Sequence, residues 1–120
     1  MPDTSIAPLD LVKALAWVDG DQELLAELVA VFLEDLPARL QALRVAVQTE
    51  DAQGTERAAH SLKGAMASLG GETARTLAYE IEQMGRAGRL GGVQPLFAEL
   101  EDELGRIARF ASESSWREQV

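Results

Sequence analysis

The feature that most constrains the fold is a long run of apolar residues at helical spacing in the first half of the chain. From Gln22 to Thr49, apolar side chains recur every three or four residues, which is the period of an amphipathic α-helix. Pro37 falls inside this run, removes one backbone hydrogen bond and predicts a kink near Leu33. The stripe keeps its phase across Pro37, which favours one bent helix, with a true break as the alternative. The stripe consists of Leu25, Leu28, Phe32, Leu36, Leu40, Leu43 and Val47.

Similar patterns predict four further helices, separated by short links rich in Gly and Asp. Long amphipathic helices with short links pack as antiparallel neighbours. We therefore expect an all-α fold, an antiparallel up-and-down four-helix bundle with a short additional N-terminal helix over one end. The further helices are expected at about Pro8 to Val18, Ala52 to Leu69, Glu72 to Ala87, and Gln94 to Ala111.

The chain is expected to be one domain, residues 1–120, with a core at about 9–111 and frayed termini. Met1 to Ala7 is polar, and the helical signal fades from Ser112 onward, although Trp116 could fold back.

Composition narrows the possible functions. The formal net charge of -9 disfavours a nucleic-acid partner, which needs clustered Lys and Arg. The chain has no cysteine, which excludes disulfides and thiolate metal sites. Neither a signal peptide nor a membrane span is recognisable, so we expect a cytoplasmic protein, and a monomer.

The chemistry centres on the stretch Ala58 to Gly71, which holds the only histidine, His60. On a helix, His60 falls almost opposite the apolar Leu62 and points to solvent. Lys63 supplies a mobile cation one turn later. Gly64 costs about 1 kcal/mol relative to alanine inside a helix, but it leaves open space beside the imidazole. A nucleophile, a cation and a gap together suggest a histidine that carries a phosphoryl group.

The motif H-S-L-K-G-x-x-x-x-x-G, from His60 to Gly70, resembles the signature of histidine-containing phosphotransfer (HPt) domains. The similarity covers roughly Leu9 to Phe110, nearly the whole chain. Other matching segments are Gly20-Asp21, Glu23-Leu24-Leu25, Phe32-Leu33, Ala59, Ile81-Glu82 and Gly85-Arg86.

The resemblance implies that His60 relays a phosphoryl group between aspartates of response-regulator receiver domains, with a hybrid sensor histidine kinase upstream. Lys63 would stabilise the phosphoryl oxygens, and Gly64 would let the receiver approach. The receiver would bring Mg²⁺, so this chain needs no cofactor and no metal ligands of its own. Receiver docking is assigned to the residues that flank this site, which are Arg57, Gly64, Ala67, Glu82 and Arg86.

For Glu82 two readings stay open. Its carboxylate could accept a hydrogen bond from the second imidazole nitrogen of His60. It could equally face solvent and pair with Arg86, four residues later on the same helix.

Other functions also fit parts of the sequence. The chain has no P-loop and no room for a kinase domain, so we expect a phosphorelay intermediate rather than an enzyme. One alternative is a non-catalytic helical interaction module in which His60 is incidental. Another is the phosphoacceptor domain of a larger chemotaxis-type histidine kinase. An acyl-carrier role is disfavoured because Ser61 lies in mid-helix, and a metal site because His60 lacks obvious co-ligands.

Overall fold

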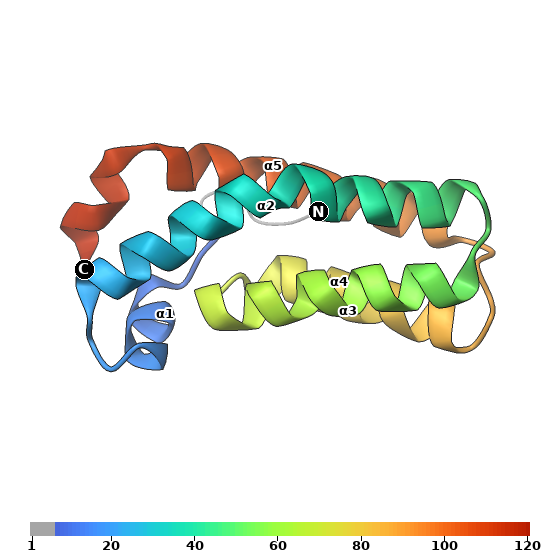
Figure 1. Ribbon diagram of the computed structural model, residues 1–120, viewed down its shortest axis with the longest axis horizontal. Helices are drawn as coiled ribbons and strands as arrows, with labels where there is room; N and C mark the ends of the chain where they lie inside the picture. The colour runs from blue at the N-terminus through green and yellow to red at the C-terminus, as the bar shows by residue number, and fades with distance from the viewer. Residues whose placement is uncertain (1–6) are drawn as a thin grey trace.

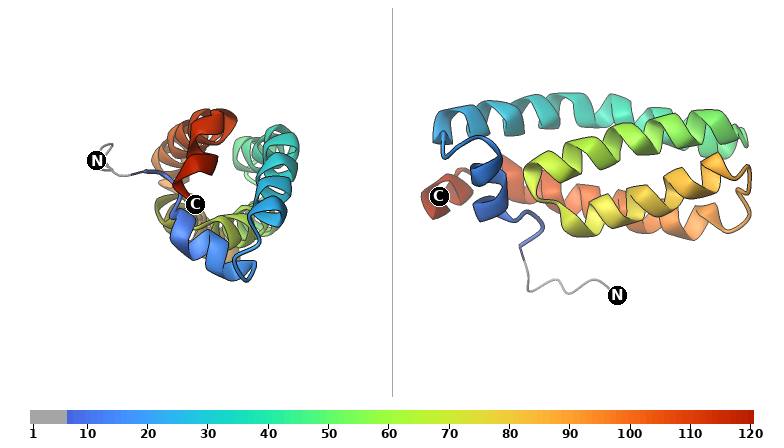
Figure 2. Two further views of the ribbon diagram at one scale, coloured as in Figure 1. Left: turned by 90° about the vertical axis from the view of Figure 1, so that its left-hand side faces the viewer. Right: turned by 90° about the horizontal axis from the view of Figure 1, so that it is seen from below.

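The computed structural model describes residues 7–120, and within that range every regular element is a helix. Consecutive long helices run in opposite directions, which gives the antiparallel up-and-down bundle expected from the sequence (Figure 1). Figure 2 shows the short first helix, α1 (Leu11–Trp17), and the C-terminal 3-10 helix, η1 (Ser114–Gln119), at the same end of this bundle. The elements are α1 (Leu11–Trp17), α2 (Gln22–Gln48), α3 (Ala52–Leu69), α4 (Glu72–Arg86), α5 (Val93–Ser112) and the 3-10 helix η1 (Ser114–Gln119).

Aspartates and glycines set the helix ends. The side chains of Asp10, Asp21 and Asp51 each accept a hydrogen bond from a backbone N–H in the first turn of α1, α2 and α3. Helix α1 begins after Asp10 and not at Pro8, so it is shorter than predicted. At the other end of α3, Gly70 has φ 74°, and a Cβ there would lie 2.4 Å from the Asp10 carbonyl oxygen. The glycine therefore lets α1 close over the end of α3.

Helix α2 is continuous through Pro37, and Figure 1 shows its first part inclined to its second. The prediction of one bent helix is confirmed. The predicted stripe was wrong at Leu28, which is 36% exposed, while Val29 is buried. At 100° per residue, Val29 lies closer to the direction shared by Leu25 and Leu36 than Leu28 does.

The C-terminal segment packs on the bundle. The expectation that this end is frayed is therefore wrong, and the alternative that Trp116 folds back is confirmed. Trp116 is buried, and its indole N–H donates to the Ala111 carbonyl oxygen at 3.0 Å. The core therefore extends from Leu9 to Trp116. The expectation for residues 1–6 lies outside the part of the chain that the structure describes.

Across residues 7–120, no helix combines the length and apolar character needed to cross a membrane.

Candidate functional site

His60 stands on the outer surface of α3, as its position in the helical pattern predicted. Its neighbours Ala59 and Leu62 are fully buried in the core, whereas its own side chain is 67% exposed. The packing of those two residues therefore fixes the rotation of α3 that presents the imidazole to solvent.

Glu82 reaches the imidazole from α4. Its side chain is 2% exposed, and its Oε2 lies 2.7 Å from His60 Nδ1. An ionised carboxylate can only accept hydrogen bonds, so this contact assigns the imidazole proton to Nδ1. In the neutral ring, the other nitrogen, Nε2, then keeps its lone pair. Of the two readings left open for Glu82, the structure shows the contact with the imidazole. The expectation that Glu82 faces solvent is wrong, although the pairing with Arg86 that went with it is present.

Two cations share the same carboxylate. Lys63 Nζ lies 2.6 Å from Glu82 Oε1, as an ion pair that lacks good hydrogen-bond alignment. Arg86 lies 3.6 Å from Glu82 Oε2 and donates from its Nε to Glu56 at 2.9 Å. Burial alone would raise the pKa of the Glu82 carboxyl, but Lys63 and His60 outweigh burial and hold that pKa below its usual value.

Glycines give this site its close packing and its open surface. A Cβ at Gly85 in α4 would lie 2.6 Å from the backbone nitrogen of Glu56 in α3, so Gly85 allows the two helices to approach. A Cβ at Gly64 would meet nothing within 4 Å, so the surface beside His60 is open. Of the other predicted docking residues, Arg57 is exposed and Ala67 is half-buried.

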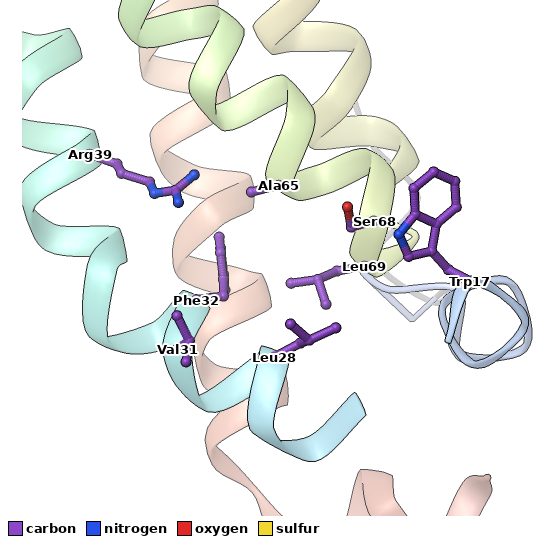
Figure 3. A pocket seen from close by; sticks show the side chains of 8 residues that line it. All are labelled: Trp17, Leu28, Val31, Phe32, Arg39, Ala65, Ser68 and Leu69. Atoms are coloured by element: carbon purple, nitrogen blue, oxygen red, sulfur yellow. The ribbon is translucent and has the colours of Figure 1, made fainter. Parts of the chain in front are cut away.

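A groove lies on the opposite side of α3 from Glu82, between α3 and α2. Arg39 of α2 stands at its upper end and donates to the carbonyl oxygen and Oγ of Ser61, the residue after His60. Trp17 of α1 stands at the other end (Figure 3). The cavity has a volume of about 240 Å³ and is lined by Trp17, Leu28, Val31, Phe32, Arg39, Ala65, Ser68 and Leu69.

Reasoning from the sequence missed both Arg39 and Trp17. Each lies outside the apolar face of its own helix, and only the packing of three helices brings them to one groove. The one available signal in the sequence was that Trp17 falls off the apolar face of the short first helix.

The fold and the site together define a class of protein: a helical bundle with one exposed imidazole, a buried carboxylate on its Nδ1 and a lysine beside it. The family model for the Hpt domain matches residues 27–110. A search among proteins of curated function finds none that matches this chain.

Two solved structures are similar over nearly their full length. One is the HPT domain of the Hpt sensor hybrid histidine kinase from Shewanella, with a TM-score of 0.82, 23% identity, and coverage of 95% of this chain and 97% of that chain. The other is histidine-containing phosphotransfer protein B (HptB) from Pseudomonas aeruginosa PAO1, with a TM-score of 0.82, 25% identity, and coverage of 94% and 96%. The chain belongs to the Hpt domain family, and its role is histidine phosphotransfer in phosphorelay signalling.

Proposed function

We propose that His60 is the phosphoryl carrier and that Nε2 is its reacting atom. The single observation that carries this proposal is the 2.7 Å contact between His60 Nδ1 and Glu82 Oε2. The Nε2 lone pair attacks the phosphorus of a receiver's aspartyl phosphate, the N–P bond forms, and the P–O bond to the aspartate breaks. The aspartate leaves as a carboxylate, and the reverse reaction passes the group to a second receiver.

Glu82 matters most once the N–P bond has formed. Because Nδ1 already carries a proton, the phosphorylated ring is an imidazolium with a positive charge. A buried carboxylate that is already in place stabilises this charge without reorganisation. Lys63, one turn along α3, supplies positive charge for the phosphoryl oxygens, and the open surface at Gly64 admits the receiver.

The groove between α2 and α3 is the docking surface in this proposal. It adjoins His60 through the Arg39–Ser61 contact, and its exposed apolar side chains suit an apolar patch on the receiver. Arg39, Arg57 and Arg86 offer local positive charge on a chain of net charge -9, opposite a receiver's acidic pocket.

Several expectations stay predictions alongside this proposal. They are that the receiver supplies Mg²⁺, that a hybrid sensor histidine kinase acts upstream, that the chain does not phosphorylate itself from ATP, and that it is a cytoplasmic monomer.

The test compares two phosphoryl donors, the small molecule phosphoramidate and a phosphorylated receiver domain. The wild type is expected to form acid-labile phosphate with both donors, and His60→Gln with neither. Val31→Glu, which places a charge in the groove, is expected to react normally with phosphoramidate but about tenfold more slowly with the receiver, because docking is weakened. Val12→Glu changes an exposed valine outside the groove and is the matched control.

Two results would contradict the proposal. If His60→Gln took up as much acid-labile phosphate as the wild type, His60 would not be the phosphoryl carrier. Equal receiver rates for Val31→Glu and Val12→Glu would remove the groove as the docking surface, while leaving the carrier assignment intact.

A further inference from the structure

Tyr79 of α4 lies beside Lys63 and has no part in the proposed attack of His60 on the phosphoryl group. Lys63 Nζ is 5.5 Å from the centroid of the Tyr79 ring, a distance at which an ammonium is attracted to an aromatic face. Tyr79 is itself 47% exposed, and it precedes Glu82 by one helical turn. The same α4 surface therefore carries both the anion and the ring that Lys63 meets.

The ring and the carboxylate together confine a side chain that is otherwise mobile. A lysine side chain has a flexible stem of four carbons, and it loses rotamer freedom whenever its ammonium is held in one place. Lys63 comes from α3, yet its side chain is only 25% exposed because it lies against α4. The ammonium is thus kept near the helix surface, on the same edge of α3 as His60.

Glu82 by itself would be an incomplete holder for Lys63. Its Oε2 accepts from His60 Nδ1 and lies 3.6 Å from Arg86, whereas Oε1, the oxygen beside Lys63, has no well-aligned hydrogen bond. A ring face attracts the ammonium without forming a directed salt bridge, so it does not prevent Lys63 from moving to a new anion.

We propose that Tyr79 is a positioning residue for phosphoryl transfer, which holds the Lys63 ammonium within reach of both Glu82 and a phosphoryl group on His60. When the phosphoryl group arrives on Nε2, Lys63 exchanges Glu82 Oε1 for a phosphoryl oxygen. The ring stays beside the lysine during this exchange, and Arg86 remains near Glu82. No covalent bond of Lys63 or Tyr79 changes. This inference rests on the proposed role of His60 as the carrier.

The first measurement needs no phosphoryl group. In the free protein, the ring current of Tyr79 is expected to shift the NMR signals of the Lys63 ε-methylene protons upfield. Tyr79→Phe keeps the ring and should keep the shift, whereas Tyr79→Leu should abolish it. Equal Lys63 shifts in the wild type and Tyr79→Leu would overturn the contact on which the inference depends.

The second measurement is the transfer rate from a phosphorylated receiver. Tyr79→Leu is expected to lower the rate at saturating receiver about threefold, with an unchanged KM, because the lysine is less often in place. Tyr79→Phe should restore the rate. In a Lys63→Met background, Tyr79→Leu should have no further effect, because the residue that the ring positions is gone.

These outcomes distinguish a positioning role of Tyr79 from other possible roles of the same side chain. A raised KM with an unchanged maximal rate would make Tyr79 a docking contact and overturn the inference. So would a full additional loss of rate in the Lys63→Met background. If the wild type accepted no phosphoryl group from any receiver, the proposed function itself would fail, and the NMR comparison would show separately whether Tyr79 holds Lys63.

Discussion

The bundle contains two buried glutamates, and they occupy very different surroundings. Glu103 of α5 is paired within its own helix, with Arg106 at 3.1 Å three residues later. Glu82 of α4 reaches across to α3, where it contacts the exposed imidazole of His60 and the ammonium of Lys63. The partner of Glu103 is Arg106, whose side chain is itself mostly buried, at 20% exposure. The partner of Glu82 is His60, whose imidazole is mostly exposed.

Glu103 has the surroundings of a structural carboxylate, whereas those of Glu82 fit the role proposed for it beside His60. A buried charge costs free energy unless it is paired and hydrogen-bonded, so both glutamates need partners. An intrahelical pair such as Glu103–Arg106 meets that need locally. Glu82 instead contacts an exposed imidazole, which is the proposed carrier of the phosphoryl group. Burial alone therefore does not identify a site, whereas burial with an exposed, reactive partner does.

Removing the charge of Glu82 should change the rate of phosphoryl transfer more than any other property. Glu82→Gln keeps the shape of the side chain but removes the charge that stabilises the imidazolium, so transfer is expected to slow about tenfold. Glu103→Gln is the matched control in the other buried carboxylate, and its rate should stay within about twofold of the wild type. Quench-flow measurement with a phosphorylated receiver gives both rates. If both variants transferred the phosphoryl group equally slowly, Glu82 would have no special role compared with Glu103.

A smaller effect is expected on the pH dependence of stability. The pKa of Glu82 is lowered in the folded chain from its ordinary value of 4.5. The unfolded chain therefore takes up this proton at a higher pH than the folded chain does. The stabilising contribution is fully present above the ordinary pKa and is lost as the pH falls through the lowered, folded value.

Urea unfolding of the wild type and Glu82→Gln at a series of pH values below neutrality checks this sign. The free energy of unfolding of the wild type is expected to fall more steeply below about pH 5 than that of the variant, because glutamine does not titrate. Parallel curves for the two proteins would show that Glu82 contributes nothing to the acid loss of stability.

Most of the fold could be predicted from local patterns. Apolar spacing and the caps at Asp21 and Asp51 located the long helices to within about a residue, because these signals act within one helix. The same reasoning placed His60 outward, since the burial of Leu62 fixes the rotation of α3.

What the sequence left undecided depends on how helices meet. The contact of Glu82 with His60 depends on the closeness of α3 and α4, which Gly85 permits because it has no Cβ to meet the backbone of Glu56. The groove from Arg39 to Trp17 needs α1, α2 and α3 in place. Periodicity describes one helix at a time and carries no information about these distances.

In the proposed mechanism, Glu82 holds the proton on Nδ1 of His60 and leaves Nε2 to react. The most direct test is NMR of the protein with ¹⁵N-labelled histidine, before and after reaction with phosphoramidate. Because the chain has one histidine, every imidazole signal belongs to His60. The structure predicts that the neutral form of the ring carries its proton on Nδ1 in the free protein, and that the phosphoryl group is on Nε2 afterwards. A proton on Nε2 in the neutral ring, or a phosphoryl group on Nδ1, would contradict the claim.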